Sequence, residues 1–231
     1  GVKNGVKKAP KAWIVREKDE RDEPTPYPDY PHPDANAVDM YLYPGAPELG
    51  RLQLQPADAP GQETVVDNFS FSGEALAQAE ITDHRLLYLS PVLQNDVHIS
   101  GLASVKVRVA SSKSTANLSV WLVSLPWNTG RRTTITDNII TRGWADPQNH
   151  RSLTESEPLT PGEFVELEFD LQPDDQIINA GQQIGLMLFS SDKDFTLHPD
   201  PGTKLTIDLE GTILTLPVVG GKAAVEKAFK W

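Results

Sequence analysis

A serine nucleophile of the α/β-hydrolase type needs a sharp turn between a strand and a helix, which the pentapeptide G-x-S-x-G marks. This pentapeptide is absent from the 231 residues of the chain. The most similar stretch, Phe69-Ser-Phe-Ser-Gly73, has Phe69 where the turn requires the first glycine. The sequence also contains no cysteine, which excludes a thiol nucleophile, a thiolate metal site and a disulfide. We therefore expect no serine or cysteine nucleophile in this chain.

The histidines are spaced too irregularly to bind a metal ion together. None of the five stands in an H-x-H or H-x-x-x-H pair, the local spacings that would support a shared metal site. His98 lies in an alternating stretch that predicts a strand with this side chain facing solvent, and His198 precedes a proline in a predicted turn. We expect all of them to be structural hydrogen-bonding residues: His32, His84, His98, His150 and His198.

Carboxylates are abundant, and two pairs could do chemistry. Glu166 and Glu168 alternate with apolar residues, so they share the polar face of one predicted strand, where surface charge is a simpler interpretation than a glycosidase pair. Asp192 and Asp194 could ligate calcium, although the surrounding residues lack the EF-hand pattern. The phosphate-binding patterns G-x-x-x-x-G-K-[ST] and G-x-G-x-x-G are also absent. The residues predict no bound cofactor.

The charge balance bears on the class of partner. The chain carries 32 acidic and 21 basic residues and a formal net charge of −11. Nucleic acids and anionic lipids require clustered Lys and Arg, so neither is an expected partner. No run approaches the roughly 20 apolar residues of a membrane span, and no signal peptide is recognisable. The compartment stays open between the cytoplasm and the outside of the cell.

Short stretches of alternating polar and apolar residues dominate the chain from Val38 onward. Such period-two runs predict half-buried strands, and the Gly, Pro, Asn and Asp clusters between them predict turns. Ile184–Phe189 is apolar throughout, which is typical of a strand covered on both faces. The clearest alternating runs are Val105–Val109, Leu118–Val123, Phe164–Phe169 and Leu205–Leu209. The pattern predicts an all-β sandwich or barrel with antiparallel pairing.

Three segments are expected along the chain. Residues 1–37 form a connector that includes one short strand at Ala12–Glu17, followed by an extended stretch with five prolines between Pro24 and Pro33 that is not expected to join a sheet. Tyr27 and Tyr30 are expected to pin this stretch to a neighbouring surface. Residues 38–221 form the β-sandwich, with a short helix near Gly73–Ile81. Residues 222–231 form a tail with helical character.

The most distinctive stretch is Thr141–Leu153, which reads TRGWADPQNHRSL. We interpret it as a loop, with Gly143 at a turn and Asp146-Pro147 ending a strand. It resembles a stretch of the C-terminal domain of bacterial Xaa-Pro dipeptidyl-peptidases. Other segments resemble that domain in the same order: Leu86–Gly101, Pro161–Asp192 and Asp200–Gly221.

The resemblance implies a jelly-roll β-sandwich of the galactose-binding-domain-like type, which is shared more loosely with cocaine esterase and α-amino-acid ester hydrolases. It also implies an α/β-hydrolase catalytic domain in the same parent chain, with its Ser, Asp and His upstream of Gly1. The parent enzyme would release X-Pro dipeptides from the N-termini of its peptide substrates. This chain would be the non-catalytic C-terminal domain of that bacterial peptidase, inactive by itself, with residues 1–37 leading out of the catalytic domain.

In relatives, this domain packs on the catalytic domain and forms part of the wall of the substrate pocket. The resemblance thus suggests contact residues in and near the distinctive stretch: Trp127, Arg142, Trp144, Asp146 and Asn149. The competing interpretation is that they pack only within the sandwich. Two other functions stay open, namely a carbohydrate- or calcium-binding accessory module and an oligomerisation domain, since a fold does not by itself confer a function.

Overall fold

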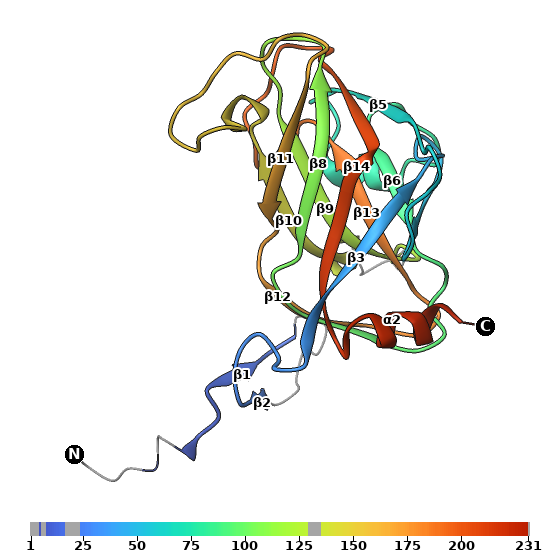
Figure 1. The fold of residues 1–231 in the computed structure, drawn as a ribbon, viewed down its shortest axis with the longest axis vertical. Coiled ribbons are helices and arrows are strands. Elements are labelled where there is room, and N and C mark those ends of the chain that lie inside the picture. Colours follow the sequence, from blue (N-terminus) through green and yellow to red (C-terminus); the bar gives the residue numbers. More distant parts are fainter. Residues whose placement is uncertain (1–4, 6–7, 17–23, 129–134, 231) are drawn as a thin grey trace.

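The computed structural model describes the chain except for residues 1–4, 6–7, 17–23, 129–134 and 231. The described part is mostly strand, as the sequence predicts (Figure 1). The strands are β1 (Ala12–Ile14), β2 (Thr25–Tyr27), β3 (Ala35–Tyr43), β4 (Gly50–Gln53), β5 (Gln62–Val66), β6 (Leu86–Leu89), β7 (Val97–Gly101), β8 (Ser104–Ser111), β9 (Leu118–Leu125), β10 (Ile139–Ala145), β11 (Phe164–Asp170), β12 (Asp174–Ile178), β13 (Gln183–Phe189) and β14 (Lys204–Val219). The helices are α1 (Gly73–Gln78) and α2 (Gly221–Phe229), with short 3-10 turns η2 (Ile135–Asn138) and η3 (Pro147–Asn149).

Twelve strands form one sheet that folds over on itself into a sandwich. Hydrogen bonding runs in the order β10–β9–β13–β6–β4–β3–β14–β7–β12, while β8 joins β14 to β11 and β5 pairs with β14. The pairings are antiparallel except between β4 and β6. Figure 1 shows β8, β11 and β14 in front of β9, β10 and β13. The predicted all-β sandwich is confirmed.

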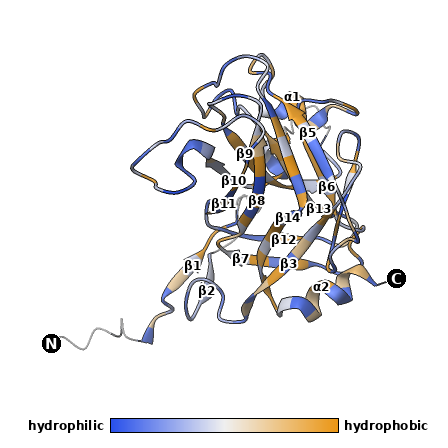
Figure 2. Ribbon diagram, turned by 45° about the horizontal axis from the view of Figure 1, so that its top comes forward, coloured by the Kyte–Doolittle hydropathy of each residue, from blue (hydrophilic) through white to orange (hydrophobic). Residues whose placement is uncertain are grey.

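Buried apolar residues form two clusters, one inside the sandwich and one on its outer face. Figure 2, a ribbon coloured by hydropathy, shows hydrophobic residues along the strands of the sandwich. Strand β9 contributes to both clusters. Leu118, Val120 and Leu122 face the interior, whereas Trp121 and Val123 face outward and are covered by α1 and η2. Strand β13, which pairs with β9, alternates between the two regions in the same way. Strand β13 is therefore covered on both faces, as the continuous apolar sequence of Ile184–Phe189 predicts.

The first residue of helix α1, Gly73, packs directly against the indole ring of Trp121. A Cβ atom at Gly73 would lie 2.3 Å from the Trp121 ring, so only glycine permits this approach. We expect Gly73→Ala to lower the free energy of unfolding by about 2 kcal/mol, because the helix must move away from the ring. Urea unfolding measures the loss. Glu74→Ala, at the exposed next position, is the control, and equal stabilities of the two variants would contradict the prediction.

The longest strand, β14, connects much of the sandwich. Its first half pairs with β5 and β8, and its second half pairs with β3 and β8 and touches β7 at Val218. Its side chains alternate between buried and less buried positions, with Leu205, Ile207 and Leu214 fully buried. After β14 the chain forms helix α2, in the tail for which the sequence predicts helical character, and α2 packs on β3 and β14.

Among the described residues, no helix is long and apolar enough to cross a membrane.

The proline-rich stretch differs from its prediction, because part of it is a strand. Thr25–Tyr27 pairs with Ala12–Ile14 in a two-stranded antiparallel sheet, with Pro26 opposite Trp13. A proline fits in a ribbon of two strands, where a backbone N–H can be spared on the outer edge. We call the described residues 8–16 and 24–34 the N-terminal strap. Figure 1 shows it beneath the sandwich, with the N-terminal end pointing away.

A buried charge cluster fastens the strap to the sandwich. The Asp175 carboxylate lies 2.8 Å from Arg16 Nη2 and 3.0 Å from His98 Nε2, and its side chain is only 4% exposed. The Tyr27 hydroxyl donates to the same carboxylate at 3.4 Å. Burial by itself raises the pKa of Asp175, but hydrogen bonds from His98 and Ser100 and the charges of His98 and Arg16 outweigh it and hold the pKa below its ordinary value.

Two further observations concern the predictions for this region. Tyr27 is buried and the Tyr30 hydroxyl donates to the backbone oxygen of Asp174 at 3.2 Å, so the expectation that both tyrosines pin the stretch is confirmed. The prediction that His98 faces solvent is wrong. Its side chain is 20% exposed because the strap covers the face of β7 that would otherwise meet water.

Candidate functional site

The distinctive stretch 141–153 begins as a strand instead of a loop. Residues 141–145 belong to β10, which pairs with β9 so that Arg142 lies opposite Trp121. Gly143 is therefore not at a turn. A Cβ atom there would lie 2.5 Å from Leu171 Cδ2, so the glycine permits a close approach between β10 and the chain after β11. The strand ends before Asp146-Pro147, as predicted, and η3 follows.

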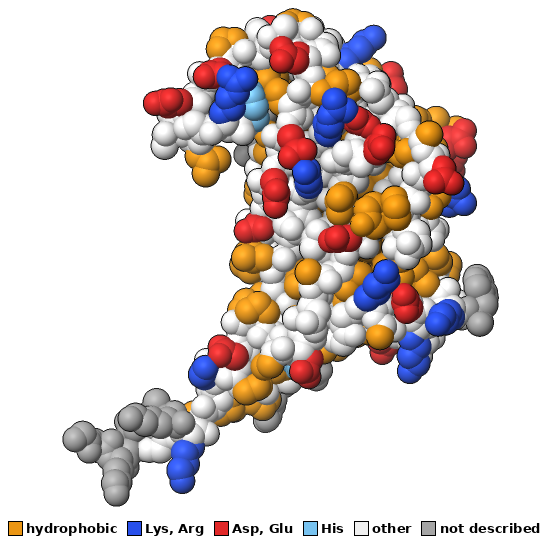
Figure 3. All heavy atoms as spheres, viewed as in Figure 1, with side chains coloured by type: hydrophobic (Ala, Val, Ile, Leu, Met, Phe, Trp, Pro, Cys, Tyr) orange, Lys and Arg blue, Asp and Glu red, His pale blue; other side chains and the backbone are white. Residues whose placement is uncertain are grey.

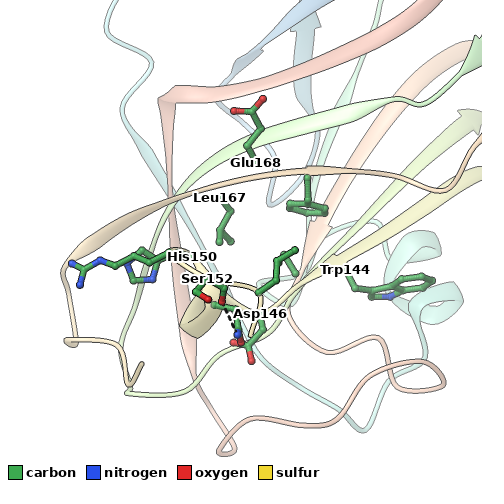
Figure 4. A pocket seen from close by; sticks show the side chains of 11 residues that line it. Trp144, Asp146, His150, Ser152, Leu167 and Glu168 are labelled. Atoms are coloured by element: carbon green, nitrogen blue, oxygen red, sulfur yellow. Dashed lines mark hydrogen bonds between the residues drawn. The ribbon is translucent and has the colours of Figure 1, made fainter. Parts of the chain in front are cut away.

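A cavity of about 520 Å³ opens where the two layers of the sandwich meet. It lies between the end of β10, the overhanging loop and β11, and its lining includes Trp144, Asp146 and Leu167. Figure 4 shows Leu167 pointing toward the turn after β10, whereas the Glu168 carboxylate points the other way. We call this cavity the seam pocket and residues 146–160 the overhanging loop. A smaller cavity of about 270 Å³ lies next to Trp144 and is also lined by Leu197.

Asp146 and Asn149 line the seam pocket, but their side chains also shape the turn. One Asp146 carboxylate oxygen accepts the Gln148 backbone N–H at 2.8 Å, which caps η3. The Asn149 side-chain amide donates to the backbone oxygen of Ser152 at 3.0 Å. These bonds hold the base of the overhanging loop in place. Both residues therefore act on the pocket through the conformation of this loop.

Arg142 and Trp144 take part in a different arrangement on the outer face of the sheet. The Arg142 guanidinium lies over the Trp121 ring, 4.9 Å from its centroid, and over the Phe195 ring at 5.2 Å. The ring of Trp144 stacks on the ring of Phe195, and the two ring centroids are 5.5 Å apart. We call Trp121, Arg142, Trp144, Asp192 and Phe195 the arginine–aromatic cluster.

Asp192 is the buried acid of this cluster. Its Oδ2 accepts the indole N–H of Trp121 at 2.9 Å and that of Trp144 at 3.2 Å. Burial raises the pKa of Asp192 above its ordinary value, although the two indole hydrogen bonds and the charge of Arg142 oppose the rise. This carboxylate holds two tryptophans in place. The described residues contain no group of three or more His, Cys, Asp and Glu side chains able to hold a metal ion, so nothing in that part of the chain favours the calcium alternative.

Trp127 lies apart from the other predicted site residues. Its ring is partly buried against the outer apolar region, together with Leu125 at the end of β9. It lines neither the seam pocket nor the smaller cavity. The structure thus divides the predicted residues into a pocket group (Trp144, Asp146 and Asn149), an arginine that stacks on aromatic rings, and a tryptophan that covers a core.

Sequence reasoning missed the segment after β13. Phe195 and Leu197 are large apolar residues in a polar turn, and their side chains are 58% and 88% exposed. Leu153, at the far side of the seam pocket, is 94% exposed. The sequence signal for this site is the presence of large apolar residues in charged, turn-rich stretches.

Figure 3 shows that the outline of the molecule is concave between the overhanging loop above and the N-terminal strap below.

Comparisons with known proteins place this arrangement in a family. The family model described as "X-Pro dipeptidyl-peptidase C-terminal non-catalytic domain" matches residues 4–227. A relative from Rhodopirellula baltica, named "Putative Xaa-Pro dipeptidyl-peptidase", is 65% identical over 226 residues, which cover 98% of this chain and 36% of the relative. The chain thus spans little more than a third of the length of that relative.

Solved structures agree on the fold. An α-amino acid ester hydrolase superposes with a TM-score of 0.60 at 16% identity, covering 79% of this chain and 36% of that one. A CocE/NonD family hydrolase from Staphylococcus aureus superposes with a TM-score of 0.67 at 12% identity, covering 94% of this chain and 43% of that one. The likeness is one of fold, and the sequence relationship comes from the family match. The chain belongs to the family of non-catalytic C-terminal domains of X-Pro dipeptidyl-peptidases.

Proposed function

We propose that this domain docks on an α/β-hydrolase catalytic domain of the same parent chain and supplies one wall of its substrate pocket. The parent enzyme would release X-Pro dipeptides from the N-termini of peptides through an acyl-enzyme intermediate. In this proposal residues 1–37 lead out of the catalytic domain, residues 38–221 form the docking sandwich, and residues 222–231 close it with a helical tail.

The observation that carries the proposal is the seam pocket with its exposed apolar rim. Isolated exposed apolar side chains are ordinary on a protein surface, but a group of them around a cavity marks an interaction site. Leu153, Phe195 and Leu197 are such a group: Leu153 lines the seam pocket, Leu197 lines the smaller cavity, and Phe195 stacks on Trp144, which lines both. The concave outline between the overhanging loop and the strap gives a second globular domain a surface to occupy (Figure 3).

The absence of a nucleophile motif predicts how the isolated chain behaves. We expect no turnover of an X-Pro chromogenic dipeptide by the chain alone, and turnover by the full-length parent that a serine-directed inhibitor abolishes. Inhibitor-sensitive turnover by the isolated chain would contradict the assignment of the chemistry to the catalytic domain. The same assay with the parent tests the substrate class.

Leu153 offers the most direct test of the pocket wall. Because its side chain is almost fully exposed in this domain, Leu153→Arg should leave the folding of the domain intact. In the full-length parent, a large cation at this position disturbs the wall, and we expect kcat/KM for the X-Pro substrate to fall about tenfold. Steady-state kinetics on the purified parent gives the measurement.

The control is Leu49→Arg, at a leucine that is 53% exposed. Leu49 lies in the turn between β3 and β4, which Figure 1 shows on the other side of the sandwich from the overhanging loop. This variant should keep the parental kcat/KM. If both variants matched the parent, the seam pocket would not be part of the substrate wall.

A further inference from the structure

The guanidinium of Arg142 contacts two aromatic rings. Strand pairing sets Arg142 opposite Trp121, whose ring centroid is 4.9 Å from the guanidinium, and the turn after β13 brings the Phe195 ring to 5.2 Å from it. Phe195 is supported in turn by Trp144, whose indole is fixed by Asp192. An arginine arranged in this way has lost most of its side-chain freedom before any partner arrives, which favours binding of a planar, charged group.

The hydrogen-bond donors of this arginine are nevertheless unused. No carboxylate of the described residues lies within 4.0 Å of its guanidinium nitrogens, and its side chain donates no hydrogen bond to any described residue. The Nε atom is buried without a partner, whereas the two Nη atoms reach the surface. Asp192, the nearby acid, already accepts from two indoles. Arg142 therefore has no ion-pair partner among the described residues, although its charge acts on Asp192 at longer range.

The surroundings of Arg142 match the anatomy of a protein–protein contact. Energetically important contacts are enriched in Trp and Arg that are surrounded by apolar groups able to exclude water. Here the rim is provided by Phe195 and Leu197, both exposed, and by the cavity of about 270 Å³ between Leu197 and Trp144. A carboxylate is the ligand that fits the free edge of a guanidinium, because its two oxygens can accept parallel hydrogen bonds.

We propose that Arg142 is the receptor for an acidic side chain of the catalytic part of the parent chain, and that this buried ion pair is the anchor of the interface between the two domains. The inference rests on the proposed function and names the chemistry of its contact. The sequence that the relatives have beyond the matched region is long enough to supply such a partner, since this chain spans only 36% of the Rhodopirellula baltica relative.

The test uses the full-length parent with a site-specific protease sequence inserted after Gly5, so that the strap stays with this domain after cleavage. Binding between the two cleaved halves is then measured by biolayer interferometry. We expect Arg142→Lys and Arg142→Met to raise the dissociation constant at least about 30-fold, because the partner carboxylate is left buried and unpaired. Lysine keeps the charge but lacks the planar fork, so it tests the bidentate contact without removing the cation.

The matched control is Arg51, which also stacks on an aromatic ring, that of Tyr43, on another part of the sandwich. Arg51→Lys and Arg51→Met should leave the dissociation constant within twofold of the parental value. Near-UV circular dichroism, which reports the packing of Trp121 and Trp144, shows whether each Arg142 variant retains the cluster. If the parental halves separate at once, the proposed docking and the anchor both fail. If they stay together and the Arg142 variants bind equally well, only the anchor fails.

A chemical readout separates a contact from a merely structural role. Phenylglyoxal modifies accessible arginines, and mass spectrometry locates the modified residues. Arg142 should be protected in the intact parent and reactive in the separated domain, whereas Arg51 should react equally in both. Equal reactivity of Arg142 in the two states would overturn the proposal.

Discussion

Arg85→Met is expected to lower the free energy of unfolding by about 4 kcal/mol or more, the largest effect of any single substitution proposed for this domain. The Arg85 side chain is 1% exposed, and burial lowers the pKa of its guanidinium from the ordinary value. Two of its nitrogens donate to backbone oxygens at 2.7–3.2 Å, from the turn after β3 and from the end of α1: Ala46, Pro47, Glu48 and Ala79.

The size of the effect follows from what the substitution leaves behind. Methionine fills much of the same space but donates nothing, so all four carbonyls lose the guanidinium. The oxygens of Ala46 and Pro47 keep the backbone N–H groups of Leu87 and Thr82, whereas the bond from Arg85 to Ala79 at the end of α1 and the bond to Glu48 are lost without replacement by protein. Chemical denaturation of the isolated chain measures the loss. Arg151→Met, which removes an exposed ion pair with Glu157, should cost less than about 1 kcal/mol. A small cost at Arg85 would mean that the turn rearranges to reach water.

Asp175→Asn is expected to cost about 3 kcal/mol, because it leaves the nearly buried Arg16 guanidinium without its counter-charge. The effect should be concentrated in the strap, since Arg16 and Tyr27 are attached to the sandwich through this carboxylate. Hydrogen exchange should therefore accelerate in β1 and β2 more than in β13. Asp29→Asn is the control, because the Lys11–Asp29 pair is exposed and should contribute little.

The same carboxylate predicts a pH dependence. Its folded-state pKa lies below the ordinary value of 3.8, so its contribution to stability is present above pH 3.8 and is lost as the pH falls through the folded-state pKa. The difference in melting temperature between the parental chain and Asp175→Asn should therefore be present at pH 5 and should shrink as the pH falls below 3.8. A difference that stays constant to pH 2 would assign the stabilisation to packing instead of charge.

Much of the fold follows from local pattern. Alternation located the strands that have one face in the interior, and the continuous apolar run predicted that β13 would be covered on both faces. Pattern failed where a tertiary contact decided the outcome. Thr25–Tyr27 is a strand because β1 supplies a partner, and His98 is partly buried because the strap lies over β7. Tyr27, the strap residue that contacts His98, is 71 residues from it, and β1 is separated from β2 by the acidic and basic stretch after Ile14, in which no pattern indicates a pairing.

The candidate site was predicted in part. The distinctive stretch contributes Trp144, Asp146 and Asn149 to the seam pocket, as the sequence suggests. The turn expected at Gly143 is instead part of strand β10, which directs the side chains of Arg142 and Trp144 to the outer face of the sheet. The other half of the cluster comes from the turn after β13, about 50 residues further on. In the sequence, the nearby carboxylates Asp192 and Asp194 suggest a calcium ligand. The structure shows instead that the Asp192 carboxylate accepts hydrogen bonds from the indole N–H groups of Trp121 and Trp144.

The long strand β14 has a consequence for the order in which the protein is made. It lies near the C-terminal end of the chain, yet its register joins Leu214 to Met40 on one side and to Val105 on the other. During translation, β3 and β8 therefore lack their shared neighbour until β14 (Lys204–Val219) has left the ribosome, and contacts so distant in sequence form slowly. A catalytic domain encoded upstream would emerge and fold first. In the docked arrangement that we propose, the sandwich closes next to this folded domain, which shields the unpaired edges of β3 and β8 until β14 is made.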